Sequence, residues 1–152
     1  MLAKTTLAVT LFFILLFISS IENKIIFVLI ALISTFIADI DSKYSTLGKK
    51  KTFRILQFFT KHRGIIHSFT FVFLVTLVFV LFFPIIALPF FLGYCVHLFL
   101  DSFTIHGITP FYPLKMKYKG KITTGGKAET TIFVIFIILD VLLFFFKAYS
   151  GF

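Results

Sequence analysis

Residue types that bind metal ions occur in four short motifs of this sequence. The motifs hold three of the four histidines and four of the six acidic residues. They are Asp39-Ile40-Asp41, His62-Arg63-Gly64-Ile65-Ile66-His67-Ser68, His97-Leu98-Phe99-Leu100-Asp101 and the isolated Glu129. Polar and charged groups are costly in apolar surroundings unless they are compensated. Their concentration within a chain that is 59% hydrophobic therefore indicates a functional site.

The residues in these motifs form a nitrogen and oxygen ligand set for a divalent metal. Zinc fits such a set best, followed by manganese or iron. This many candidates exceed the four ligands of one tetrahedral ion, which indicates two or more metals that share carboxylates. Such centres catalyse displacement at phosphorus, in which a metal-bound water attacks and the metals, here with Arg63, stabilise the developing charge. Glu129 is expected to act as a general base or as a further ligand. The candidate metal ligands are Asp39, Asp41, His62, His67, His97 and Asp101.

The spacing within two of the motifs constrains how their side chains can meet. His97 and Asp101 are four residues apart, so on a helix they lie on one face and can share an ion. A lone His on an apolar helix is usually a packing residue, but its pairing with an acid inside an apolar run favours ligation. Asp39 and Asp41 can reach one centre only if the helix ends between them, because an extended pair two residues apart points to one side. A simple helix end is an equal alternative for this pair.

Other ionisable residues carry weaker indications. His62 and His67 flank a basic, glycine-containing turn, and they could equally mark the membrane interface. His106, on a flexible loop, is an optional further ligand. Asp140 lies in an apolar run, about 16 Å along a helix from Glu129. It is far from the other motifs and receives no assignment.

The composition places the chain in a lipid bilayer. With 25 Phe and a mean hydropathy of +1.08, it is far more apolar than a soluble domain. We predict an all-α fold, a polytopic membrane helical bundle that forms a single domain over residues 1–152. The fourth hydrophobic helix is short for a full crossing, and a tight turn is expected from Pro84 to Pro89, because proline disfavours continuation of a helix. About five hydrophobic helices are expected, over Thr5–Ile21, Ile25–Ala38, Phe69–Phe83, Phe90–Leu100 and Thr131–Phe146.

The basic residues predict the orientation of these helices. If the five segments alternate, every Lys and Arg except Lys24 and Lys147 falls on one side of the membrane. The positive-inside rule then places the N-terminus and two long basic loops, Ser42–Gly64 and Ser102–Lys127, in the cytoplasm. All four motifs fall at that same level. The first apolar run is interpreted as a retained helix, since no Ala-x-Ala-like cleavage site follows it. The expected location is the inner membrane, with the lipid bilayer as partner.

The motifs, taken together, resemble those of the YdjM family of inner-membrane proteins, which are described as predicted metal-dependent hydrolases. The resemblance covers about residues 35 to 130, and it implies a membrane-embedded metal hydrolase in which the seven motif acids and histidines are functional. The family often carries a His near the N-terminus, where this chain reads Ala3-Lys4-Thr5-Thr6, so one ligand is absent. Ala38 also replaces a usual Pro. The matching segments are Asp39-x-Asp41, His62-Arg63-Gly64-x-x-His67-Ser68, Gly93-Tyr94-x-x-His97-x-x-x-Asp101 and Thr124-Gly125-Gly126-x-x-Glu129.

Several functional alternatives follow from the same residues. The segment from Gly93 to Asp101 is remotely similar to part of zinc-dependent phospholipase C and P1 nuclease, which implies a phosphodiester or phospholipid substrate. A metal transporter or channel would also use intramembrane His and Asp, but it requires ligands near the midplane rather than at one end. A non-enzymatic membrane protein with a degenerate metal site is the third alternative. No specific nucleic-acid partner is predicted, and the sequence does not indicate an oligomeric state.

Overall fold

A computed structural model describes residues 1–37 and 65–150 of the chain. Within these two ranges the regular structure is all α-helical, apart from one turn of 3-10 helix and two isolated β-bridges. This confirms the predicted fold class. The elements are α1 (Ala3–Phe17), η1 (Ile18–Ser20), α2 (Lys24–Ile37), α4 (Phe69–Phe82), α5 (Pro84–Ser102) and α6 (Lys127–Ser150). Three segments are long and apolar enough to cross a membrane, Ala3–Ser20, Pro84–Ser102 and Lys127–Ser150, whereas α2 and α4 are shorter apolar helices.

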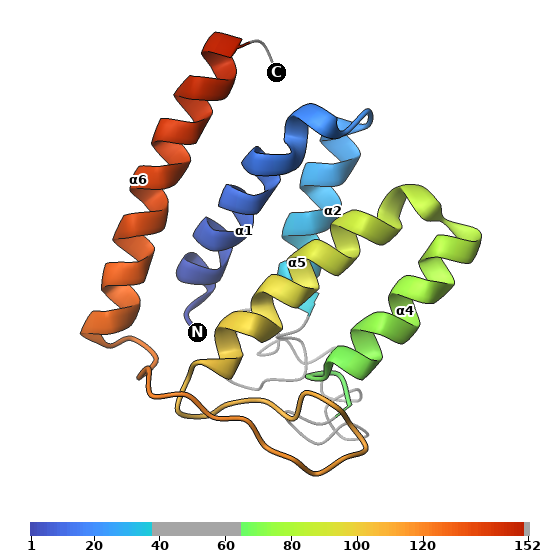
Figure 1. Cartoon of the computed structure of the whole chain (residues 1–152), viewed down its shortest axis with the longest axis vertical. Helices are drawn as coiled ribbons and strands as arrows, with labels where there is room; N and C mark the ends of the chain where they lie inside the picture. The colour runs from blue at the N-terminus through green and yellow to red at the C-terminus, as the bar shows by residue number, and fades with distance from the viewer. Residues whose placement is uncertain (38–64, 151–152) are drawn as a thin grey trace, which may run out of the picture.

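The helices form a bundle in which α5 is central. It packs against α2, α4 and α1, while α6 packs against α1 at one edge of the bundle (Figure 1). The amino terminus, the C-terminal end of α5 and the first turns of α4 and α6 all lie at one end of the bundle (Figure 1). Motif residues from distant parts of the sequence are thereby brought to one level, as the predicted alternation of helices requires.

The contact between α2 and α5 depends on a glycine. A Cβ atom at Gly93 would lie 2.0 Å from the carbonyl oxygen of Ala31 and 2.3 Å from Ser34 Oγ. Small residues of this kind allow membrane helices to approach closely. The neighbouring hydroxyl groups bond across the interface, with Ser34 Oγ donating to Pro89 O at 3.4 Å and Thr35 Oγ1 donating to Gly93 O at 3.4 Å. The resulting tight packing holds α5 firmly in the bundle.

The predicted turn from Pro84 to Pro89 is wrong. The chain breaks only at Phe83, and α5 begins at Pro84 and runs for 19 residues. Proline suits the first position of a helix, because the N–H that it lacks would have no intrahelical partner there. Pro89 lies within the helix, buried against α2. The fourth helix is consequently not short, but one of the three long enough to span a bilayer.

The connection between α5 and α6, which was predicted as a long basic loop, is irregular and is held by backbone hydrogen bonds. Ile108 and Tyr118 exchange two of these bonds, both of 2.9 Å, and Ile105 N donates to Ile122 O at 3.0 Å. Gly107 has a φ of +63°, and any Cβ there would lie 2.0 Å from Tyr118 O. The connection passes across the end of the bundle that carries the motif residues (Figure 1).

Candidate metal centre

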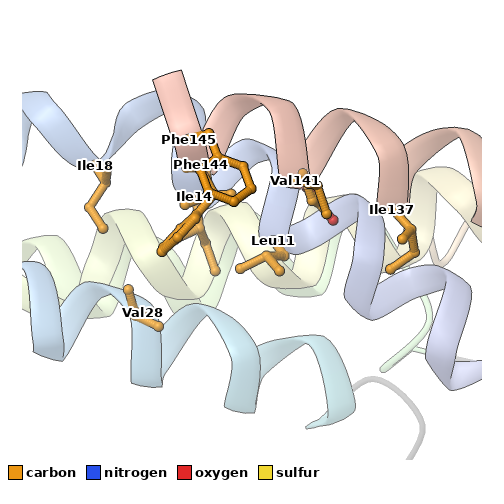
Figure 2. A pocket seen from close by; sticks show the side chains of 10 residues that line it. Leu11, Ile14, Ile18, Val28, Ile137, Val141, Phe144 and Phe145 are labelled. Carbon is orange, nitrogen blue, oxygen red and sulfur yellow. The ribbon is translucent and has the colours of Figure 1, made fainter. Parts of the chain in front are cut away.

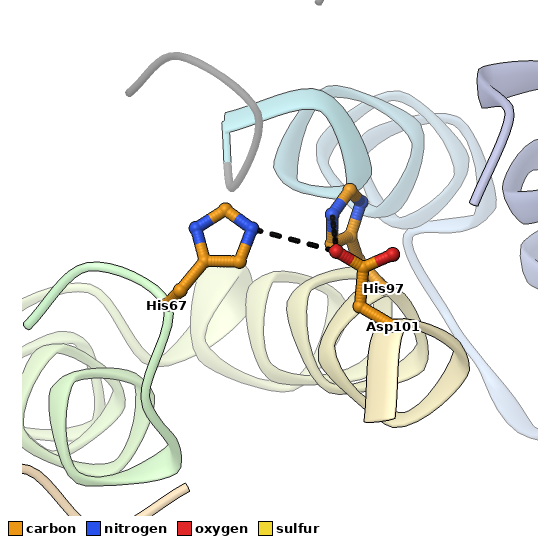
Figure 3. Close-up of side chains that lie close together, drawn as sticks. All are labelled: His67, His97 and Asp101. Carbon is orange, nitrogen blue, oxygen red and sulfur yellow. Dashed lines mark ion pairs between the residues drawn. The ribbon is translucent and has the colours of Figure 1, made fainter. Parts of the chain in front are cut away.

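Three of the predicted ligands meet at the end of α5. His67, His97 and Asp101 each offer one ligand atom, and these atoms all lie within 4.8 Å of one another. Oδ2 of Asp101 is 3.7 Å from His67 Nε2 and 3.8 Å from His97 Nε2 (Figure 3). The three residues are only 1%, 2% and 3% exposed, respectively. The spacing of four residues places His97 and Asp101 on one face of the helix, as predicted.

Residues of α5 also fix the position of His67, which precedes α4. The hydroxyl of Tyr94, one turn before His97, donates a 3.0 Å hydrogen bond to the carbonyl of Ile66. Ser68 then caps α4, since its Oγ accepts a hydrogen bond from Phe71 N at 3.2 Å. Tyr94 and Ser68 are completely buried. The backbone on both sides of His67 is therefore held by specific polar contacts, which orient the ring towards Asp101.

The end of α5 is fixed in a similar way. Thr104 is fully buried, and its Oγ1 donates a 2.7 Å hydrogen bond to the carbonyl of Asp101. Gly107 N donates to the same hydroxyl at 3.3 Å. The connection between α5 and α6 thus begins with a closed turn against Asp101. These bonds fix the backbone that carries Asp101, which reduces the reorganisation needed to bind a ligand there.

The donor atoms fit a first-row divalent metal. Two imidazole nitrogens and one carboxylate oxygen form a set used by zinc, and also by manganese and iron. Bonds of about 2.0–2.2 Å would separate tetrahedral ligand atoms by roughly 3.4 Å, close to the two distances from Asp101 Oδ2. Three protein ligands would leave a position for water or substrate, as in catalytic rather than closed structural zinc sites.

The start of the chain contacts both acids at this end of the bundle. The amino group of Met1 forms an ion pair with Oδ1 of Asp101. The backbone N–H of Leu2 donates to Oε1 of Glu129, and Gly125 N donates to Oε2 of the same side chain at 2.6 Å. Glu129 is 1% exposed and lies in the first turn of α6, where a negative charge is favourable. It joins α1 to α6 but is outside the three-residue group of possible ligands.

The remaining predicted residues are not brought into this group by the described parts of the chain. Asp39, Asp41, His62 and Arg63 lie outside the described residues. His106, the optional ligand, is exposed on the connection after α5. No local pattern predicts the contacts of Met1 and Leu2, because each joins residues 100 or more positions apart. Tyr94 belongs to the Gly93–Asp101 segment that resembles the family motif. Its contact beside His67, however, is visible only in the folded structure.

The comparison with known protein families agrees with the resemblance noted in the sequence. The family described as YdjM inner membrane protein matches residues 1–151, which is nearly the whole chain. No significant match was found among curated proteins or among solved structures.

Proposed function

Since the chain belongs to the YdjM inner membrane protein family, we propose that it is a membrane-bound metal-dependent hydrolase of phosphoesters or phospholipid-like molecules. One observation carries the proposal, namely the buried group formed by His67, His97 and Asp101, whose ligand atoms lie within 4.8 Å of one another. Ionisable residues within membrane helices are rare and usually functional. His97 and Asp101 lie in such a helix, and His67, from the turn before α4, joins them at one buried point. We propose that the three bind a shared metal, with zinc preferred and manganese or iron as alternatives.

The residues have distinct roles in this proposal. A metal bound there would lower the pKa of a water molecule and polarise a phosphoryl oxygen. His67 and His97 would each supply one imidazole nitrogen to the metal, and Asp101 supplies the charge that favours a cation. Arg63 is proposed to stabilise the developing negative charge, and Asp39, Asp41 and His62 to complete a second metal position.

The contacts of Glu129 support a positioning role. Both carboxylate oxygens already accept backbone N–H groups, from Leu2 and Gly125. A general base must be within hydrogen-bond reach of the proton that it takes up, and Glu129 lies outside the group formed by His67, His97 and Asp101. We therefore assign Glu129 to positioning, because it ties the start of α1 and the turn before α6 to the end of the bundle that holds Asp101.

The location of the site favours a lipid-like substrate. His97 and Asp101 lie in the last two turns of an apolar helix long enough to span the bilayer. The connection that follows α5 carries Lys115, Lys117, Lys119 and Lys121, and it lies at the same end of the bundle (Figure 1). These lysines would attract anionic headgroups. We propose a multi-pass protein with this end in the cytoplasm.

The decisive test is metal analysis together with hydrolysis measurements on purified protein. The wild type is expected to retain divalent metal and to hydrolyse a phospholipid or a generic phosphodiester. Asp101→Asn should reduce metal affinity by more than the roughly 10- to 100-fold that loss of an outer-shell partner costs, and should abolish turnover. The matched control is Glu22→Gln, an exposed acid at the other end of the bundle, which should change neither quantity.

The other outcomes of this test separate the alternative functions. Wild-type protein that binds no divalent metal at any tested concentration would rule out the hydrolase. Metal binding without turnover, combined with metal flux into liposomes, would instead identify a transporter. Metal binding with neither activity would indicate a non-enzymatic protein with a degenerate site.

A further inference from the structure

A second buried acid lies away from the candidate metal centre. Asp140 is near the middle of α6, and its side chain is 5% exposed although most of the neighbouring residues of this helix are exposed. Glu129 is the other buried residue of α6, and it lies about 16 Å away along the helix axis. A carboxylate at the centre of a membrane helix is costly, and such residues usually mark a functional site.

Asp140 lines an apolar cavity between three helices. The cavity has a volume of about 560 Å³, within the range of small-molecule binding sites. Apart from Asp140, every side chain that lines it is a hydrocarbon. Figure 2 shows the side chains of α1, α2 and α6 converging on this space. They include Leu11 and Ile14 of α1, Ile18 of η1, Val28 of α2, and Val141 and Phe144 of α6.

The carboxylate of Asp140 has no hydrogen-bond partner in the described parts of the chain. Both Oδ1 and Oδ2 are buried and unpaired there. Lys147, the nearest cation on α6, is about 10 Å further along the axis, and its Nζ donates to Ser19 Oγ instead. That hydrogen bond connects the C-terminal part of α6 to η1, further along the bundle than the cavity residues Ile18 and Phe144. Unpaired acceptors in an apolar cavity carry a large desolvation cost, which a ligand with a suitable donor would remove.

We propose that this cavity binds a lipophilic amine, an amphiphile with one long alkyl chain and one ammonium group. The apolar walls suit the chain, and the buried carboxylate complements the cation. An ion pair is strong in such surroundings because the effective dielectric constant is low. A small amphiphile fits better than a partner helix, because Asp140 is only 5% exposed and a slender ammonium group can approach it more closely than the surface of a helix can.

The absence of Trp from the chain allows a specific binding assay. Phe144→Trp places a single fluorophore in the cavity, where a ligand with a terminal bromine quenches it on binding. We would compare 12-bromododecylamine with 12-bromododecanol in detergent micelles. The amine is expected to reach half-maximal quenching at a concentration at least tenfold below that of the alcohol. Adding Asp140→Asn, which keeps the side-chain size but removes the charge, should abolish this preference.

Two controls separate binding from partitioning into the micelle. Phe146→Trp places the fluorophore on the outer face of α6, where the native side chain is 66% exposed, and it should show no difference between amine and alcohol. Glu22→Gln removes an exposed acid and should leave the preference unchanged in the Phe144→Trp background. As a measurement on native side chains, the amine should raise the melting temperature of the wild type more than that of Asp140→Asn.

Several outcomes would overturn the proposal. Equal quenching by amine and alcohol, or an amine preference that survives Asp140→Asn, would show that Asp140 does not recognise a cation. If the amine also quenched the Phe146→Trp variant more strongly than the alcohol, the preference would reflect partitioning into the micelle and not binding in the cavity. A dimer that depends on Asp140, without any amine preference, would assign the surface to a second copy of the chain. Should Phe144→Trp fail to fold, the melting temperatures of the wild type and of Asp140→Asn decide the question. An equal effect of the amine on the two would reject the proposal.

Discussion

The hydroxyl of Tyr94 is the contact that joins the two halves of the candidate metal centre. It bonds to the carbonyl of Ile66, directly before His67, from a position three residues before His97 on α5. Outer contacts of this kind hold ligands in orientation, and their loss commonly reduces metal affinity by about 10- to 100-fold. The tyrosine therefore contributes to the site although it offers no metal ligand in this arrangement.

Tyr94→Phe is expected to weaken metal binding without removing it. The substitution leaves the buried Ile66 carbonyl without this donor, which should also lower the free energy of unfolding by about 1–3 kcal/mol. Metal affinity would be measured by competition with a chelator, and stability by thermal unfolding in detergent. Tyr118→Phe, at an exposed position, is the matched control and should alter neither. Unchanged affinity in Tyr94→Phe would show that the position of His67 does not depend on this bond.

The helices show which parts of the fold the sequence could predict. Local periodicity was sufficient for His97 and Asp101, because both lie on one helix and their relation follows from the residues per turn. The turn predicted at Pro84–Pro89 is wrong, because a proline that starts a helix and one that ends it cannot be distinguished in the sequence without knowing the neighbouring helix. The contact of Leu2 with Glu129 joins residues 127 positions apart, and no local pattern encodes such a contact.

The contact between α2 and α5 yields a prediction for Gly93. In Gly93→Ala the new methyl group would overlap the Ala31 carbonyl, a backbone atom that cannot turn aside. The two helices must separate, and overpacking of this kind costs about 1–3 kcal/mol. Thermal unfolding in detergent should show this loss, whereas Leu88→Ala, at an exposed position of the same helix, should have little effect. An equally stable Gly93→Ala variant would mean that the helices do not pack this closely.

At the scale of the whole molecule, polar chemistry and positive charge gather at one end of an apolar bundle. The candidate metal centre and the lysine-bearing connection after α5 share this end, and α6 leads away from it to the other (Figure 1). Lys24 and Lys147 are the basic residues at the opposite end of the described chain. By the positive-inside rule, the end with the candidate metal centre should face the cytoplasm. A substrate of the proposed hydrolase would then come from the cytosol or the inner leaflet.

Cysteine labelling in intact cells tests this orientation, since the chain contains a single cysteine, Cys95. In a Cys95→Ala background, Lys117→Cys should react with a membrane-impermeant maleimide only after the membrane is disrupted. Tyr149→Cys, at a position 95% exposed near the end of α6, should react in intact cells, because α6 is long enough to cross the bilayer. Labelling of both sites on the same side would show that α6 does not cross. The reverse pattern would place the candidate metal centre outside the cytoplasm, so that a substrate of the proposed hydrolase would be sought in the outer leaflet.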